Sequence, residues 1–434
     1  MGAHPQGKTP MIVIGVLFFV FGFVTWLNGP LITFVKLAFN LDDVNAFLVP
    51  MVFYLSYFFL SLPSSVLLRF TGMKKGMGAG LLIMAVGAFI FGEFATNRVF
   101  GGALVGLFII GAGLSLLQTA ANPYISILGP IESAAQRIAV MGICNKIAGM
   151  LAPVAIGAVV LNGIGDLDQR VQAAGSPEAK EQILDAFAAK IHAPYLAMAG
   201  LLALLAVWVI RSPLPEISAG TANAAPEDQA QGRTQGPGIL HFPHLWLGVL
   251  CLFLYVGVEV MAGDAIGTYG HGFDLPLDET KFFTSFTLAA MLAGYLGGLA
   301  LIPRVLSQER YLAFSAALGA VLTVAAYATQ GYASVACVAA LGFANAMMWP
   351  AIFPLGIRGL GRHTETGSAL MIMGIAGGAI LPQLFVHLKQ EHDFQAVFLA
   401  LMAPAYLYIL FYALWGHRIG PKAAKPESLD SAIA

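Results

Sequence analysis

Two carboxylates lie inside one long apolar segment of this sequence, where charged side chains are rare. Glu259 and Asp264 stand within the run from about residue 243 to residue 270. A carboxylate at membrane depth is costly and is typical of an ion pathway or a substrate site. Five residues correspond to about 140° around a helix axis, so we expect the two carboxylates not to share one ion. Glu259 lies deeper, and we expect it to serve in ion coupling. It would do so either as an acid that binds and releases a proton or as a ligand of a sodium ion. Asp264 either contributes to coupling or faces water near the outer end.

One lysine lies in another apolar segment at a similar expected depth. Lys146 follows Asn145 in the run from about residue 136 to residue 161. A buried ammonium group needs a counter-charge or a water-filled cavity. One hypothesis is an ion pair between Lys146 and an acidic residue of the 243–270 segment, broken or screened when cation and cargo bind. The alternative is a fixed structural role in which the lysine binds backbone carbonyls.

Several amide and aromatic side chains within the apolar segments favour a polar, uncharged cargo. Amides both donate and accept hydrogen bonds, as hydroxyl groups of a sugar require, and an aromatic ring can pack on a sugar's apolar face. The alternative is that the amides hold neighbouring helices together around Pro123 and Pro350. The candidate substrate-binding residues are Asn28, Gln118, Asn122, Asn145, Asn345, Trp26 and Trp349.

The composition indicates the medium in which these groups lie. Of 434 residues, 58% are hydrophobic and only 10% are charged, whereas soluble domains are about one quarter charged. A bilayer core needs roughly 20 apolar residues for each helical crossing. Solid apolar runs exclude the alternating pattern of barrel strands, and lipid requires internally paired backbone groups. The sequence therefore predicts an all-α membrane protein.

Other function classes lack their sequence signals. The net charge of −1 includes no basic block, so nucleic acid is not an expected partner. The sequence contains no phosphate-binding glycine-lysine loop, no paired metal histidines and no nucleophile elbow. We therefore expect no enzyme, no cofactor and no metal, except for a sodium ion possible near Glu259. Transport would then draw its energy from ion gradients.

The apolar runs divide into two sets of six. A polar, proline-rich stretch separates them, and a second polar insert spans residues 165–190. We expect a first six-helix bundle at 1–211, a cytoplasmic linker at 212–240, a second bundle at 241–418 and a cytoplasmic tail at 419–434. Basic residues near the span ends predict that both termini and the linker are cytoplasmic. The basic residues on that side are Lys8, Arg69, Lys74, Lys75, Arg137, Arg211, Arg233, Arg304, Arg310, Arg358, Arg362, Arg418, Lys422 and Lys425.

Three motifs then show a family resemblance. Phe18–Ile32 (FFVFGFVTWLNGPLI), Leu117–Pro130 (LQTAANPYISILGP) and Tyr255–Asp264 (YVGVEVMAGD) resemble the fucose/glucose/galactose/N-acetylglucosamine branch of sugar:cation symporters in the major facilitator superfamily. The WLNG and CNKIAG stretches are most similar to its bacterial N-acetylglucosamine and glucose/galactose permeases. Where fucose-transporting members carry coupling carboxylates on the first and fourth helices, this sequence has Gly29 and Gln118. The two halves also match internally, since Gln118 and Pro123 recur as Asn345 and Pro350.

The resemblance implies twelve transmembrane helices in two pseudo-symmetric six-helix halves, with a cargo site between them. It implies uptake of a neutral hexose with Na⁺ or H⁺ by alternating access in a bacterial inner membrane. A monomer surrounded by lipid is the expected working form. The alternatives are a facilitated sugar uniporter, a proton-coupled drug exporter and a non-transporting sensor. The many amides favour a polyhydroxylated cargo over an apolar one.

Overall fold

The computed structural model describes residues 8–127, 134–215, 238–302, 305–360 and 363–420. Most of the predicted linker and nearly all of the predicted tail lie outside the described residues. So do the end of the Leu117–Pro130 motif and five of the basic residues, Arg233, Arg304, Arg362, Lys422 and Lys425.

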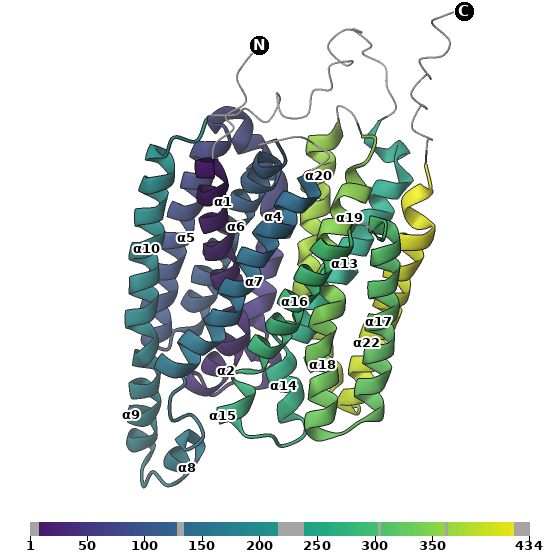
Figure 1. Cartoon of the computed structure of the whole chain (residues 1–434). Helices are drawn as coiled ribbons and strands as arrows, with labels where there is room; N and C mark the ends of the chain where they lie inside the picture. The colour runs from purple at the N-terminus through teal and green to yellow at the C-terminus, as the bar shows by residue number, and fades with distance from the viewer. Residues whose placement is uncertain (1–7, 128–133, 216–237, 303–304, 361–362, 421–434) are drawn as a thin grey trace, which may run out of the picture.

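The first half of the chain forms a bundle of six crossings, drawn from purple through blue to teal in Figure 1. Its crossings are α1 (Lys8–Thr25) with α2 (Asn28–Ala38), α4 (Leu48–Thr71), α5 (Met73–Thr96), α6 (Phe100–Ile127), α7 (Ala134–Val159) and α10 (His192–Arg211). Between them lie the short helices α3 (Asp43–Ala46), α8 (Leu167–Gln172), α9 (Pro177–Ala188) and η2 (Ala189–Ile191).

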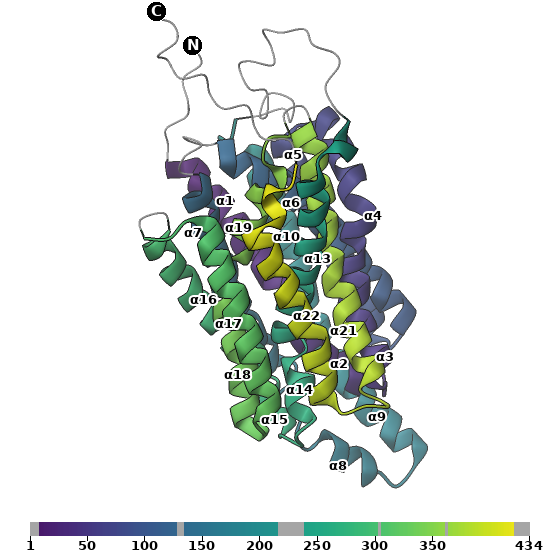
Figure 2. The ribbon, with the colours of Figure 1, turned by 90° about the vertical axis from the view of Figure 1, so that its right-hand side faces the viewer.

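The second half forms a matching bundle beside the first, drawn from teal to yellow (Figures 1 and 2). Its crossings are α13 (Pro243–Gly263) with α14 (Ile266–His271), α16 (Phe283–Leu301), α17 (Gln308–Ala328), α18 (Gly331–Asn345) with α19 (Met348–Ile357), α20 (Thr364–Met373) with η5 (Gly374–Ala376) and α21 (Gly377–Leu388), and α22 (Phe394–Leu414). The short helices are η3 (Ile239–His241), α15 (Leu277–Thr280) and η6 (Gly416–Arg418). Among the described residues, 11 helices suit a membrane crossing, and α18 with α19, bent by 41°, makes up to 12. The predicted all-helical membrane architecture of two six-helix halves is confirmed.

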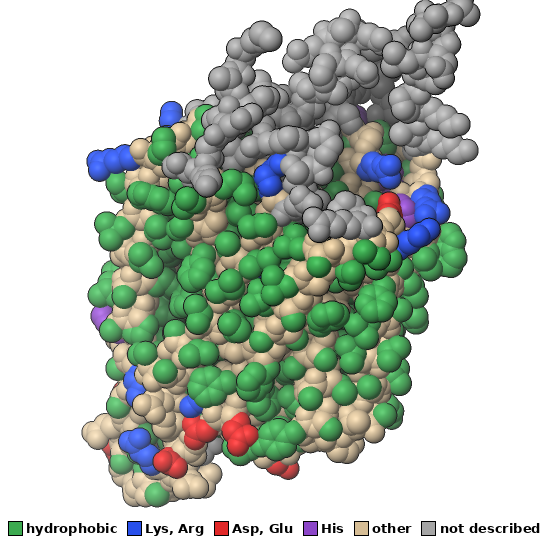
Figure 3. Space-filling view, viewed as in Figure 1, with side chains coloured by type: hydrophobic (Ala, Val, Ile, Leu, Met, Phe, Trp, Pro, Cys, Tyr) green, Lys and Arg blue, Asp and Glu red, His purple; other side chains and the backbone are tan. Residues whose placement is uncertain are grey.

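The two ends of the bundle differ in what they carry. We call the end where α10 finishes and α13 begins the linker face, and the end with α8 and α9 the insert face (Figure 1). On the face drawn in Figure 3, hydrophobic side chains cover the middle, and charged side chains gather toward the two ends. Large apolar side chains are exposed in this middle zone, as lipid contact requires, and Leu204 is 70% exposed.

Three crossings predicted as continuous segments are interrupted. The first breaks between α1 and α2, where Trp26 and Leu27 form a turn, and the tenth breaks between α18 and α19. In both cases a proline, Pro30 or Pro350, is the third residue of the new helix. Proline has no N–H to donate and fits the first turn of a helix, where that N–H would have no partner, although Pro63 and Pro153 are also accommodated inside α4 and α7. The seventh crossing breaks at Asp264, between α13 and α14.

Close backbone contacts hold each half together. A methyl group at Gly22 of α1 would lie 2.1 Å from the Asn145 carbonyl oxygen of α7. In the second half, a methyl group at Gly377 of α21 would lie 1.7 Å from the Phe253 carbonyl oxygen of α13. Only glycine allows backbones to approach so closely. Between the halves, α4 packs against α20 and α21, and α7 packs against α16. We call these two interfaces the seams.

Candidate functional site

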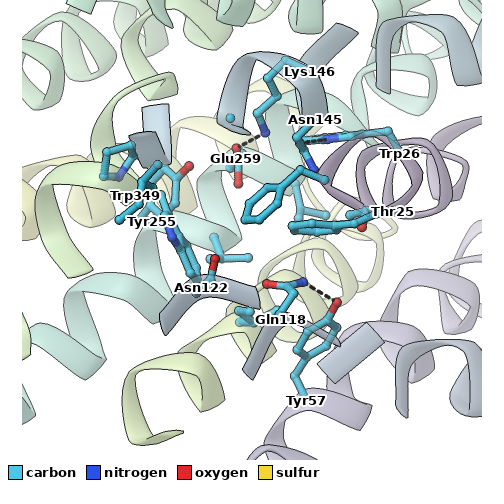
Figure 4. A pocket seen from close by; sticks show the side chains of 18 of the residues that line it. Thr25, Trp26, Tyr57, Gln118, Asn122, Asn145, Lys146, Tyr255, Glu259 and Trp349 are labelled. Carbon is cyan, nitrogen blue, oxygen red and sulfur yellow. Dashed lines mark hydrogen bonds and ion pairs between the residues drawn. The ribbon is translucent and has the colours of Figure 1, made fainter. Parts of the chain in front are cut away.

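A cavity of ≈ 100 Å³ lies between the two halves at the seams. Helices α1, α4, α6 and α7 line it from the first half, and α13, α16, α19 and η5 line it from the second. One water molecule needs about 10–15 Å³ of such a cavity, so this cavity has room for several water molecules. Its lining combines amides, tyrosines, tryptophans and one ion pair (Figure 4).

The ion pair crosses from one half to the other. Lys146 Nζ of α7 lies 2.9 Å from Glu259 Oε1 of α13 (Figure 4). Both side chains are largely buried, with exposed fractions of 7% and 12%. Lys146 also lies 4.4 Å from the centre of the Trp26 ring, where an ammonium is attracted to the electron-rich ring face. The structure thus brings together three residues that the sequence singled out separately.

Three of the predicted amides line the cavity. Gln118 Nε2 donates a 2.7 Å hydrogen bond to the Tyr57 hydroxyl. Trp26 Nε1 lies 3.4 Å from Asn145 Oδ1, a long hydrogen bond, and Asn122 completes the set (Figure 4). These groups come from α4, α6, α7 and the turn after α1, so the first half provides the amide wall of the cavity.

Within the part of the chain that the structure describes, the second half contributes no amide to the lining, and its three aromatic side chains add to those of the first half. Trp349 lines the cavity and stacks on Phe353, with ring centres 5.8 Å apart and an angle of 15° between the planes. Tyr255 and Tyr295 also line it. Tyr255 precedes Glu259 by one helical turn on α13, which places both on one face. These three aromatic residues form the aromatic wall, which together with the amide wall suits a ligand with hydroxyl edges and an apolar ring face.

Two predicted binding residues do not line this cavity. Asn345 is fully buried, and its Oδ1 accepts a 2.9 Å hydrogen bond from the Tyr406 hydroxyl of α22. It therefore joins two helices within the second half, the structural alternative stated above. Asn28 is 1% exposed and follows the break after Trp26, which directs it away from the cavity lining and toward Tyr54.

The second predicted carboxylate is separated from the cavity by a tyrosine. Asp264 is 2% exposed, and its Oδ2 accepts a 3.1 Å hydrogen bond from the Tyr54 hydroxyl of α4. Tyr54 lines the cavity, whereas Asp264 does not. In this structure Asp264 thus lies in the packed region between the cavity and the insert face, away from bulk water.

Tyrosines are the main lining residues that the sequence did not single out. Tyr54, Tyr57, Tyr255 and Tyr295 all contact the cavity. In an apolar segment a tyrosine resembles any other core aromatic residue. One signal was available, because Tyr54 and Tyr57 are spaced three residues apart and so share one helix face.

Polar contacts close the seams at the insert face. Asp43 Oδ1 of α3 lies 2.5 Å from Lys36 Nζ in the same half, and Asp43 also pairs with Lys389 of the other half. Gln383 Nε2 of α21 donates a 3.1 Å hydrogen bond to the Val44 carbonyl. These contacts link the halves on the side of the cavity that faces the insert.

A cavity that carries amides and an ion pair between two six-helix halves is typical of a secondary membrane transporter, and the chain belongs to the Major Facilitator Superfamily, whose sequence profile matches residues 14–382. This family consists of transporters and not of enzymes. Among its sugar-transporting members, a "Glucose/galactose transporter" of Brucella abortus is 32% identical over 410 residues, covering 93% of each chain. The predicted family is thereby confirmed.

More distant relatives agree in fold. An "L-fucose-proton symporter" of Escherichia coli (strain K12) is 27% identical over 375 residues, covering 86% of this chain and 85% of that protein. The crystal structure of the major facilitator transporter FucP in the outward conformation superposes with a TM-score of 0.73 at 25% identity. That match covers 94% of this chain and 98% of FucP.

Proposed function

We propose that this protein imports a neutral hexose, of the glucose/galactose or N-acetylglucosamine class, together with Na⁺ or H⁺. The observation that carries the proposal is the cavity between the halves, which combines an amide wall, an aromatic wall and the Lys146–Glu259 pair. Hydroxyl groups of a hexose can pair with Gln118, Asn122 and Asn145. Trp349 offers a flat surface for the apolar face of the ring.

The ion pair supports alternating access as the mechanism. Lys146 and Glu259 belong to different halves, so any movement that parts the seams has to separate the two charges or provide other partners. A sugar in the cavity provides hydroxyl groups for both. Binding of the cargo thereby compensates for part of the cost of parting the halves, and an empty carrier lacks this compensation.

The sequence pattern supports further parts of this proposal. We propose an inner-membrane protein with the linker face cytoplasmic, because Arg69, Lys75, Arg211 and Arg358 all lie near helix ends at that face. The proposed bundles are residues 1–211 and 241–418. A monomer is proposed as the working unit, since one chain contains both walls of the cavity.

Facilitated uniport is the second candidate, and one observation favours it. Gly29 and Gln118 occupy the positions at which the resemblance to fucose transporters implies carboxylates. Gln118 is uncharged and bonded to Tyr57, so it carries no titratable group into the cavity. A uniporter would exchange sugar across the membrane without concentrating it.

Transport by purified protein in lipid vesicles tests the proposal. Counterflow of D-glucose, D-galactose, N-acetylglucosamine and L-fucose identifies the cargo, and imposed sodium or pH gradients then test accumulation. We expect counterflow of at least one of the first three sugars, together with accumulation under one gradient. Counterflow without accumulation under either gradient would support uniport instead, and no counterflow would reject sugar transport.

A further inference from the structure

Asp264 is a buried carboxylate that the Lys146–Glu259 pair does not account for. It is the least exposed carboxylate among the described residues. Its Oδ2 accepts a hydrogen bond from Tyr54, and the Gly29 backbone N–H of α2 also faces the carboxylate, while the buried Oδ1 makes no hydrogen bond of normal geometry. Within the described residues, no lysine, arginine or histidine forms an ion pair with it. A negative charge held in this way at membrane depth has no compensation of its own.

Asp264 also lies between two cavities. On one side lies the central cavity, which Tyr54 lines, and Tyr54 separates Asp264 from it. On the other side, Gly267 and Thr268 of α14, three and four residues farther along, line a second cavity of ≈ 380 Å³ at the insert face. A charge or proton at Asp264 is therefore within one side chain of the central cavity and about one helical turn of the outer one.

Helix α2, which faces α14, also runs from Asp264 to the cavity at the insert face. A methyl group at Gly29 would lie 2.6 Å from Thr284 Oγ1 and 3.4 Å from Asp264 Oδ1, so the α2 backbone lies close to the carboxylate, and the contact with Thr284 requires glycine there. Ile32 and Thr33, three and four residues after Gly29, line the same outer cavity. The starts of α2 and α14 thus enclose Asp264 and lead from it to the insert face.

The groups around Asp264 supply hydrogen bonds but no counter-charge. From α4 comes Tyr54, and from α2 comes Asn28, whose Nδ2 is buried without a hydrogen-bond partner. Glu259, one turn and a half earlier on α13, adds a second negative charge. The nearest cation on α7, Lys146, is already bonded to Glu259 at 2.9 Å. A proton bound to Asp264 removes the uncompensated charge.

The surroundings do not suit a sodium ion. Hard cations bind sets of several oxygen ligands. Thr284 and Thr287 of α16 direct their hydroxyl hydrogens to the carbonyl oxygens of Gly263 and Ala262, each at 2.8 Å. Both hydroxyl groups are thus bonded to backbone carbonyls, and among the described residues the Tyr54 hydroxyl is the one side-chain oxygen that hydrogen-bonds to Asp264, which falls short of such a ligand set.

We propose that Asp264 binds the coupling ion of this transporter and that the ion is a proton. The inference rests on the proposed sugar symport and names its ion and its ion-binding residue. When the seams part at the insert face, the carboxylate takes one proton from water in the outer cavity and forms one O–H bond. After the halves close there and open toward the linker face, that O–H bond breaks, and the proton passes Tyr54 and bonds to a water molecule in the central cavity. One proton and one sugar move inward, and the carboxylate regains its charge.

Purified wild type, Asp264→Asn and Asp274→Asn in lipid vesicles test this inference. Asp274 is exposed and has a φ of 58°, a conformation that asparagine adopts readily, so Asp274→Asn is a matched control. With one proton per sugar, an inward gradient of about one pH unit supports about tenfold accumulation of D-glucose or D-galactose. We expect this accumulation in wild type and Asp274→Asn. In Asp264→Asn we expect counterflow without accumulation.

Two results overturn the inference while leaving sugar transport intact. One is normal pH-driven accumulation by Asp264→Asn, and the other is wild-type accumulation that follows only a sodium gradient. Absence of wild-type counterflow overturns the proposed function itself, and the inference with it.

A second measurement does not depend on how well the variant folds. Adding D-glucose or D-galactose to wild-type protein in weakly buffered detergent with a pH dye should make the solution more alkaline, because sugar binding favours the protonated carrier. No proton uptake by sugar-binding wild-type protein would also overturn the assignment of Asp264.

Discussion

Removing Lys146 should leave Glu259 as an uncompensated charge at the seams. The pair is 2.9 Å long and its side chains are 7% and 12% exposed, so it counts as buried. Deleting one partner of a buried ion pair costs about 3–5 kcal/mol, whereas replacing both partners by uncharged residues is often nearly neutral. Because this pair borders a cavity that holds water, we expect the lower end, about 3 kcal/mol, for Lys146→Met.

This magnitude can be measured as a change in thermal stability. For a unit of about 200 residues, 1 kcal/mol shifts the unfolding midpoint by about 2–4 °C, so Lys146→Met should lower it by about 6–12 °C. Glu259→Gln alone should cause a similar loss. The double variant should regain at least half of it, since neither charge is then left without a partner. Scanning fluorimetry of the purified proteins in one detergent provides the assay.

The matched control is Lys75→Met, which removes an exposed lysine near the start of α5. It should shift the midpoint by no more than about 1 °C, because exposed charges contribute little. Two results would show that the ion pair does not hold the halves together. One is an unfolding midpoint equal to that of the wild type in both single variants, and the other is a decrease in the double variant that equals the sum of the two single decreases.

Three further predictions concern binding, packing and gating. Gln118→Ala should raise the half-saturating sugar concentration in counterflow by about 10–100-fold, the equivalent of 1–3 kcal/mol for a lost buried partner, while Asn345→Ala should lower the melting temperature and leave that concentration unchanged. Gly377→Ala should reduce the yield of folded protein in size-exclusion chromatography, because its methyl group has no space beside Phe253. Asp43→Asn should increase labelling of a cysteine introduced at Thr33, since the contact with Lys389 that closes the insert face is weakened.

The positions of the crossings could be predicted because lipid imposes one requirement on every segment. About 20 apolar residues with internally paired backbone groups suffice to identify a crossing, whatever it packs against. The breaks were harder to predict. Residues 11–38 form one apolar run, and nothing in its hydrophobicity marks the turn at Trp26 and Leu27. Pro30 and Pro350 indicate a local weakness, but their effect depends on the helices around them.

The direction of each side chain was not accessible from sequence. In a soluble helix the polar face identifies the outside, but here lipid-facing and core-facing residues are both apolar, so the pattern does not fix the rotation of the helix. Gln118 and Asn345 illustrate the difficulty. Each is an amide five residues before a proline in one of the two related halves, yet Gln118 lines the cavity and Asn345 bonds to Tyr406. Lys146 and Glu259 were easier to identify, because a charge in lipid demands a partner wherever it points.

The glycine contacts at Gly22 and Gly377 have a consequence for how such a molecule can move. Where one backbone touches another, a helix cannot slide along its partner without a carbonyl oxygen blocking its way. We therefore expect each of the helix pairs α1–α7 and α13–α21 to move as a rigid unit within its own half. Displacement falls instead on α4 against α21 and on α7 against α16, where side chains meet and can exchange neighbours. Two spectroscopic labels within one such helix pair should keep a constant separation through the transport cycle. Two labels on opposite sides of a seam should change their separation.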